Sequence, residues 1–427
     1  MRYAALILIM LAAPAAAAAQ DVELRFTGDV RVRAEARRAA PENETDAFTL
    51  LRSRLGVIAS LSPGAHAYVQ LQDSRTFGEE ASTMDGAADE LDVHQAFVEL
   101  GWTPTAALPL AVRAGRQEIV LGDERLVGAV DWTNTGRAFD GVRLFVRPDE
   151  TSWRASLHAA TVAERGTLAG EPDPAGSRND YLTFGARLEA GPLALQALHD
   201  VSAVWRTYRG IDRTTLDAAF RVPGIAPWVV RVEGAYQLGD HALIETGAQQ
   251  DIRAHFLSAR AGREPVGGAV ARLSLGADYL SGDEDPESGD FGAFNTLYAT
   301  NHKFYGYLDA FVDPAWDTRG RGLFDIVGAI AVRAGERAQL ALDVHRFSLA
   351  ERFPDADERE LGWELDLTVP VEVGPGQRLV AGYSAFRNGP AAALLGHGDD
   401  GTWRHWGYAQ LSFTFGPRFA DAPVPAI

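Results

Sequence analysis

The chain has 427 residues, of which 46% are hydrophobic, a formal net charge of −18 and no cysteine. The negative charge argues against nucleic-acid binding. The lack of cysteine excludes a disulfide framework, a thiolate metal site and a cysteine nucleophile.

The N-terminus reads as an export signal. Arg2 gives the positive charge, residues 3–13 form a short apolar run, and Ala17 to Ala19 form a small-residue cleavage site before Gln20. We therefore expect residues 1–19 to be a cleaved signal peptide. Elsewhere no stretch approaches about 18 consecutive apolar residues, so the sequence predicts no transmembrane helix.

Residues 20–419 alternate between polar and apolar side chains in segments of about ten residues, which is typical of β-strands. In 22–33 the valines alternate with acidic and arginine residues, and 337–345 behaves alike. In 360–369, Leu361, Trp363 and Leu365 share one face with Leu367 and Val369. A soluble β-sandwich alternates in the same way, so alternation alone leaves both folds open.

We expect about eighteen strands, an even number as in single-chain bacterial barrels. They start near Asp21, Ala47, Ala65, Glu90, Leu110, Phe139, Trp153, Asp180, Leu193, Asp212, Trp228, Asp251, Ala269, Arg321, Ala338, Glu358, Gln377 and Gly401. A short proline-rich tail, residues 420–427, is expected to be disordered.

The connections alternate between short and long, which favours a barrel because outer-membrane barrels have short periplasmic turns and long extracellular loops. The fold class is therefore predicted to be all-β, a transmembrane antiparallel up-and-down barrel of outer-membrane type with a wide lumen and both termini on the periplasmic side. The short connections are 62–64, 148–152, 191–192, 223–227, 263–268, 335–336 and 374–376, and the long ones are 77–89, 120–138, 164–179, 239–250, 282–320 and 388–400.

Many arginines have the parity of the lumen face. Arginine suits passage of carboxylates because its guanidinium donates bidentately and keeps its charge. Alternatively, inward acids pair with these arginines in a wall network. Arg116 has awkward parity and would face lipid unless a bulge re-aims it. The candidates for the lumen path are Arg52, Arg54, Arg116, Arg143, Arg187, Arg231 and Arg404.

Two connections, 115–144 and 300–311, place aromatic rings beside cations, a combination that suits contact with acidic sugars. The alternative is that these connections merely fold into the lumen and are anchored there. The candidates for sugar contact are Trp132, Arg137, His302, Lys303, which is the only lysine of the chain, and Tyr305.

Signals for an enzyme or a metal are weak. The pairs Asp92/His94 and Asp343/His345 place an acid and an imidazole on one strand face, but such pairs arise easily by chance. No G-x-S-x-G or H-E-x-x-H motif is present, so we expect no enzyme. In the acidic loop 283–290, Asp283, Asp285 and Asp290 are candidates for a structural calcium ion, but EF-hand spacing is lacking. We otherwise expect no cofactor.

Four stretches resemble the alginate export family of outer-membrane proteins. They are YVQLQDSRTFGE from Tyr68, HQAFVEL from His94, GRQEIVLGDERLVGAVDWTNTGRAFDGVRL from Gly115 and TNHKFYGYLDAF from Thr300. The resemblance implies an eighteen-stranded barrel through which an anionic polysaccharide or its fragments diffuse along an arginine-lined pore. Within it, Arg116 lies in the GRQ stretch, and Arg52 and Arg54 lie in the segment LRSRLG, which resembles the family's second strand.

The leading hypothesis is a passive outer-membrane channel for an anionic saccharide. The expected partners are membrane lipid and lipopolysaccharide, the saccharide, the outer-membrane assembly machinery and periplasmic export or uptake components. One alternative is a general porin for small solutes, whose conductance oligouronates do not block. The others are a barrel enzyme, which would need His94 or His345, and a surface adhesin with a plugged, non-conducting lumen.

Overall fold

The structure is a computed structural model. It describes residues 22–38, 45–62, 64–77, 91–105, 108–146, 153–163, 181–205, 208–243, 246–263, 268–285 and 289–417. The expected signal peptide and C-terminal tail lie outside these residues, as do most of the connections expected at 77–89 and 164–179.

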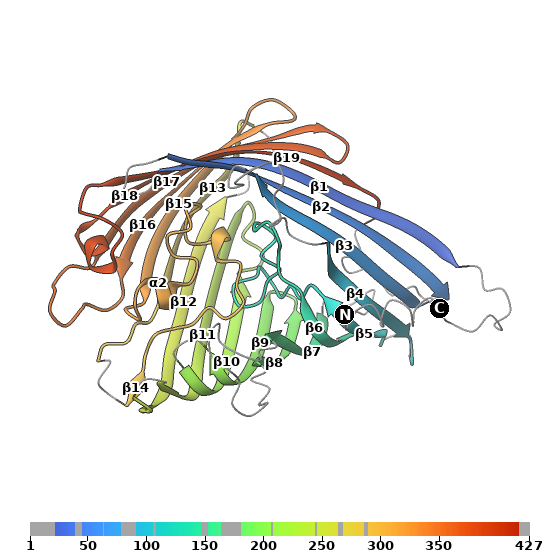
Figure 1. The fold of residues 1–427 in the computed structure, drawn as a ribbon, viewed down its shortest axis with the longest axis horizontal. Coiled ribbons are helices and arrows are strands. Elements are labelled where there is room, and N and C mark those ends of the chain that lie inside the picture. Colours follow the sequence, from blue (N-terminus) through green and yellow to red (C-terminus); the bar gives the residue numbers. More distant parts are fainter. Residues whose placement is uncertain are drawn as a thin grey trace.

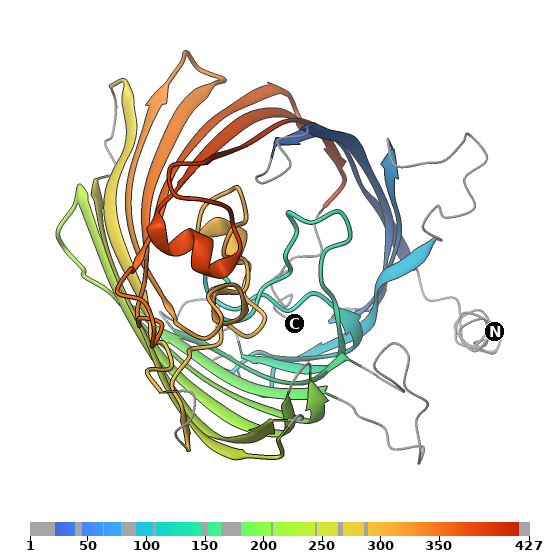
Figure 2. The ribbon, with the colours of Figure 1, turned by 60° about the vertical axis from the view of Figure 1, so that its left-hand side comes forward.

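Within the described residues, eighteen long antiparallel strands form one closed barrel, because each strand pairs with the next and β1 also pairs with β19 (Figures 1 and 2). A further two-residue strand, β14, pairs in parallel with β12 outside this ring. The strands are β1 (Glu23–Arg38), β2 (Thr45–Ser62), β3 (Ala65–Phe77), β4 (Asp92–Trp102), β5 (Leu110–Gln117), β6 (Phe139–Val146), β7 (Trp153–Ala163), β8 (Tyr181–Ala190), β9 (Leu193–Trp205), β10 (Tyr208–Arg221), β11 (Trp228–Leu243), β12 (Gln249–Arg263), β13 (Val270–Leu280), β14 (Asp290–Phe291), β15 (Leu323–Arg333), β16 (Gln339–Leu349), β17 (Glu360–Gly374), β18 (Gln377–Asn388) and β19 (Trp403–Phe415).

The predicted fold class is confirmed, and the barrel strands begin close to the predicted positions. The long connection predicted at 239–250 is wrong, because Asp240 pairs with Asp251 and Ala242 with Gln249, so the hairpin continues through it. Gly239 suggested a turn. It instead allows a close approach between strands, since a Cβ there would lie 1.9 Å from the Asp212 carbonyl oxygen.

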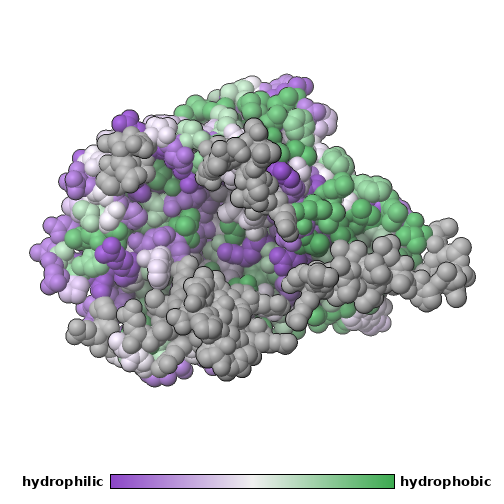
Figure 3. Space-filling model, in the orientation of Figure 1, coloured by the Kyte–Doolittle hydropathy of each residue, from purple (hydrophilic) through white to green (hydrophobic). Residues whose placement is uncertain are grey.

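The two faces of the wall differ as the alternation predicts. On β1, Val32 is 41% exposed while its neighbours Arg31 and Arg33 are buried in the interior. Hydrophobic residues cover the surface over β1 to β3, and hydrophilic residues gather at the opposite end, where the long connections lie (Figure 3). This is the arrangement of a barrel that meets hydrocarbon with its outer face.

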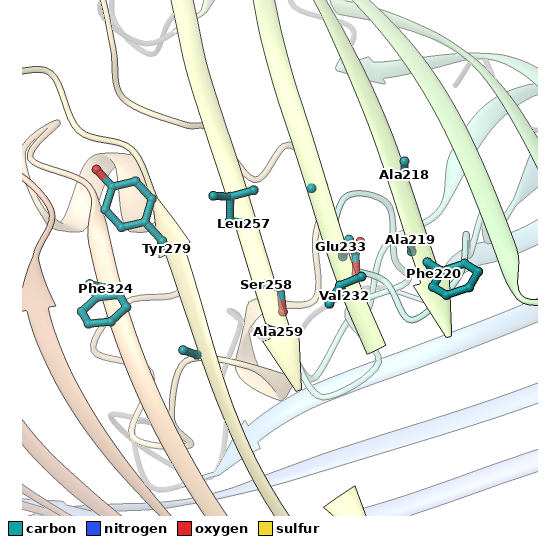
Figure 4. A pocket seen from close by; sticks show the side chains of 12 residues that line it. Ala218, Ala219, Phe220, Val232, Glu233, Leu257, Ser258, Ala259, Tyr279 and Phe324 are labelled. Carbon is teal, nitrogen blue, oxygen red and sulfur yellow. The ribbon is translucent and has the colours of Figure 1, made fainter. Parts of the chain in front are cut away.

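A shallow groove of about 610 Å³ crosses the outer surface of β10 to β15 (Figure 4). Small residues such as Ala218 and Ala277 form its floor between larger ones, among them Leu257, which is 58% exposed. Ala218, Leu257 and Ala277 have outward parity, so the groove opens on the lipid-facing surface and not in the lumen.

Leu361 corrects one detail of the predicted strand faces. The pairing of β16 with β17 shifts by one residue, from Phe347 opposite Gly362 to Ser348 opposite Glu360. This bulge turns Leu361 inward, where it is fully buried against the aromatic interior, while Trp363 stays outward.

Two connections fold into the barrel instead of projecting from it (Figure 2). We call residues 118–138 the first lumen loop and residues 281–322 the second lumen loop. Val127 pairs in parallel with Tyr298, which joins the two loops, and both pack on inward aromatic residues such as Phe139 and Phe347.

The helical turns are short: η1 (Asn301–Lys303), α2 (Pro314–Asp317) and η2 (Pro390–Leu395). None of the helices in the described part of the chain has the length and apolar character needed to cross a membrane.

Candidate functional site: the constricted lumen

The first lumen loop is held to the wall by its backbone. We call Asp131–Thr135 the tip, and each of its five carbonyl oxygens accepts a hydrogen bond from a side chain of β1, β2 or β3. The donors are Arg31 to Asp131 (2.6 Å) and Thr133 (2.6 Å), Arg33 to Trp132 (2.8 Å), Arg52 to Asp131 (3.1 Å), Ser74 to Asn134 (3.0 Å) and Arg54 to Thr135 (3.0 Å).

Arg52 and Arg54 therefore face the interior as predicted, but they are buried against the tip. Both also pair with the Asp131 carboxylate, at 2.8 and 3.0 Å. Burial alone would raise the pKa of Asp131, but the neighbouring arginines outweigh it and hold the pKa below its ordinary value. These two arginines act as anchors of the loop.

The second lumen loop is held by acids of β17. The Leu308 N–H donates to the Glu364 carboxylate at 2.7 Å, and the Tyr307 N–H donates to Asp366 at 3.3 Å. Gly306, with a φ of +81°, allows this approach, because a Cβ there would lie 2.4 Å from a Glu364 carboxylate oxygen. One loop is thus bound through its carbonyls by arginines, and the other through its amides by carboxylates.

An aromatic cluster lies where the two loops meet β1 and β19. The rings of Trp132 and His302 stack with centroids 4.2 Å apart, and the Arg33 guanidinium lies 3.9 Å from the Trp132 ring centroid. Trp406 and Tyr408 contact the indole edge-on. The structure therefore brings together two of the predicted sugar-contact residues, Trp132 and His302.

Lys303 is half-exposed beside this cluster and pairs with Glu124 of the first lumen loop. Arg137 and Tyr305, in contrast, serve the packing of the loops. Arg137 donates to the carbonyl of Tyr298, and Tyr305 is 3% exposed. Neither geometry supports the predicted sugar contact at these two residues.

A cavity of about 630 Å³ lies between residues 120–123 of the first lumen loop and the periplasmic half of the wall. We call it the arginine cavity, because five guanidinium groups line it against two carboxylates, those of Asp123 and Glu189. Both carboxylates are paired, Asp123 with Arg231 at 2.7 Å and Glu189 with Arg187 at 2.8 Å. The five arginines are Arg143, Arg154, Arg187, Arg221 and Arg231.

Two other predicted path residues lie elsewhere. Arg116 faces outward opposite Ala96 and pairs with Asp140 at 2.9 Å, so its prediction as a lumen residue is wrong; no bulge re-aims it. Arg404 faces the interior but is buried, with its guanidinium 4.4 Å from the centroid of the Phe386 ring.

Sequence reasoning missed three inward strand arginines, one of which is Arg260, paired with Asp278 at 2.7 Å. Arg113 lies opposite Glu99 and bonds it at 2.8 Å, and Arg213 bonds the Tyr181 hydroxyl at 2.9 Å. Parity alone would have identified Arg113, since it lies an odd number of residues before the outward-facing Arg116 on a regular strand and therefore faces inward. Arg213 has the same parity as Arg221 on the same strand, so parity would have identified it as well.

The predicted acid–imidazole pairs do not form. His94 bonds Glu118 of the first lumen loop at 2.8 Å, and His345 bonds Asp325 at 3.0 Å instead of Asp343. Among the described residues no three His, Asp or Glu side chains gather in a way that could hold a metal ion. Residues 286–288 of the acidic loop lie outside the described ranges, so the calcium site stays a prediction.

A closed antiparallel barrel with an apolar outer face and a polar lumen narrowed by inward-folded loops defines an outer-membrane channel protein. Comparison with known proteins agrees. The profile of the alginate export family matches residues 22–312, and the chain belongs to this family. The protein is accordingly an outer-membrane protein of bacteria.

Solved structures with a similar fold are porins at low sequence identity. OccAB1 of Acinetobacter baumannii has a TM-score of 0.62 and 12% identity over 92% of this chain and 97% of its own. OccK3 (OpdO) of Pseudomonas aeruginosa has 0.61 and 13% over 93% and 96%. OccK2 (OpdF) of Pseudomonas aeruginosa, solved in complex with glucuronate, has 0.60 and 11% over 93% and 99%. A comparison with curated protein sequences finds no match.

Proposed function

We propose that this channel passes anionic saccharides, polymers or oligomers of uronate type, by diffusion and without covalent chemistry. The observation that carries the proposal is the arginine cavity, in which five guanidinium groups face two carboxylates. A carboxylate on each sugar ring matches the planar guanidinium donor bidentately.

The position of the cavity supports the same reading. It lies between the constriction and the short periplasmic turn at Gly191 and Pro192. Arg187 and Arg231 pair with Glu189 and Asp123 at the edge of the cavity, and Arg221 is exposed within the cavity. Several weak sites of one sign allow an anion to enter, exchange partners and leave, as conduction requires. Membership in the alginate export family and the glucuronate complex of OccK2 support this substrate class.

The test is reconstitution in planar bilayers, with anion/cation permeability and current block by a uronate trisaccharide as readouts. The triple change Arg143→Gln, Arg187→Gln and Arg231→Gln leaves two guanidinium groups against two carboxylates in the cavity. We expect the reversal potential to shift toward that of cations. We also expect the trisaccharide to block at least about tenfold more weakly, since one charged hydrogen bond contributes about 1.5–3 kcal/mol.

Arg116→Gln and Arg253→Gln are matched controls, because both side chains have outward parity and both pair with acids there. They should leave selectivity and block unchanged. A triple variant with wild-type reversal potential and wild-type block would refute the role of the arginine cavity.

A second candidate is an anion-preferring porin for small solutes. The narrowing of the lumen by two packed loops favours it over a wide polymer conduit. It predicts anion selectivity that depends on the same arginines, together with ohmic current that the trisaccharide fails to block.

A further inference from the structure

A second cavity, of about 520 Å³, opens among the extracellular connections. We call it the mouth cavity. The ends of β11 and β12 contribute Leu243 and Gln250, the second lumen loop contributes Trp316 and Arg319, and the connection after η2 contributes His397. No part of it is shared with the arginine cavity on the periplasmic side.

α2 presents an indole ring to this cavity. Pro314 occupies the first turn, the Asp313 N–H donates to the Asp317 carboxylate at 2.8 Å, and the Thr318 hydroxyl donates to the Pro314 carbonyl at 2.6 Å. These bonds fix a helix of a single turn on which Trp316 remains 53% exposed. The exposed part of the indole therefore lies in the lining of the cavity.

The charged groups around the indole differ in how far they are exposed to the cavity. Of the four charged lining residues, Arg319 alone is exposed, since Asp283 and Arg321 are buried and Asp317 is partly buried. The buried Arg321 guanidinium donates to the Asp283 carbonyl at 2.6 Å and so fixes the rim of the cavity. An anion that enters therefore meets one accessible cation beside one aromatic face.

His397 adds a hydrogen-bonding group to the lining. The Asn388 amide holds the His397 carbonyl at 2.7 Å, whereas the imidazole Nε2 is buried and has no hydrogen-bond partner among the described residues. Burial, together with Arg404 and Arg319, lowers the pKa of His397 to about 4. The ring is therefore neutral at neutral pH and offers Nε2 to a hydroxyl group as donor or acceptor.

We propose that the mouth cavity captures one uronate ring of the saccharide on the extracellular side, ahead of the constriction. Trp316 stacks on the apolar face of the sugar, Arg319 binds its carboxylate, and His397 Nε2 bonds one of its hydroxyls. The volume lies within the range of small-ligand sites. The inference rests on the proposed function, because it names a subsite for the same substrate class.

The test uses the complete channel in a planar bilayer of known orientation, with a uronate trisaccharide added to one side at a time. The readout is the association rate of single blocking events. We expect Trp316→Ala and Arg319→Gln to lower the rate at least about tenfold for extracellular addition and to leave periplasmic addition unchanged. Trp316→Phe keeps an aromatic face and should retain most of the rate, which separates stacking from misfolding.

Trp403→Ala and Arg253→Gln are controls, because they remove exposed side chains of the same types at the outer surface of strands near this end. Wild-type association rates in both Trp316→Ala and Arg319→Gln, with block still sensitive to the arginine cavity, would overturn the mouth site and leave the channel proposal standing. No block of the wild-type channel from either side would overturn both. Equal association of a neutral trisaccharide would overturn the carboxylate contact at Arg319.

Discussion

Replacing Arg31 by Gln tests whether the wall arginines determine the shape of the pore. Arg31 is 5% exposed and donates to two tip carbonyls at 2.6 Å, those of Asp131 and Thr133. Each hydrogen bond to a charged group contributes about 1.5–3 kcal/mol. Since Arg52 still bonds the Asp131 carbonyl, we expect a loss of about 3 kcal/mol, which corresponds to about a 150-fold larger population of released tip.

The assay is amide hydrogen exchange over residues 131–137, together with single-channel current. We expect faster exchange that is confined to the first lumen loop, and a larger, noisier conductance. Arg25→Gln is the control, because Arg25 lies on the same strand with the same parity but pairs with Glu23 near the other end. If tip exchange in Arg31→Gln matches the wild type while the barrel remains folded, backbone anchoring does not hold the constriction.

Three further predictions follow from the loops and their packing. Gly306→Ala forces a Cβ against Glu364 and should destabilise the second lumen loop by about 1–2 kcal/mol. The measurement is the temperature at which heating changes the gel mobility of the barrel, which should fall. Gly335→Ala is the control, because Gly335 has a similar φ but open space around it, so this change should act through backbone strain alone. Because the pKa of Asp131 is lowered, its ion pairs stabilise the tip above about pH 4 and are lost as the pH falls through that lowered pKa. Current noise should therefore rise in acid. In the Asp131→Asn variant, which lacks the titrating carboxylate, acid should cause no further rise in noise. Phe347→Ala should cost about 3–5 kcal/mol of stability against heat, whereas Phe184→Ala on the outer face should cost far less.

The barrel could be predicted from the sequence because each strand must alternate between hydrocarbon and water, and this constraint applies at every residue. The sequence-based prediction failed where the backbone departs from regular strand pairing. The bulge at Leu361 reverses one side chain, and Gly239 marks a close approach of strands instead of a turn. Neither event leaves a distinct signal in the residue types themselves.

The interior was harder to predict. The parity of Arg52, Arg54 and Arg143 placed them in the lumen, but parity does not say whether a guanidinium meets a ligand or a carbonyl of the same chain. Arg52 and Arg54 meet the tip, while Arg143 lines the arginine cavity. Besides the Asp131 carboxylate, the partners of the first two in the tip are backbone oxygens, which every residue type has, so the residue types alone do not indicate those contacts.

Apart from the ion pairs with the Asp131 carboxylate, this mode of anchoring does not depend on which residues form the tip. Arg31, Arg33 and Arg54 bind main-chain oxygens, and the side chain of Thr135 is exposed. Replacing Thr135 alters the exposed surface of the tip while the hydrogen bonds from the wall to the loop persist. The substrate preference of the channel can therefore change during evolution, or be redesigned, while the barrel and the anchoring of the loop stay the same.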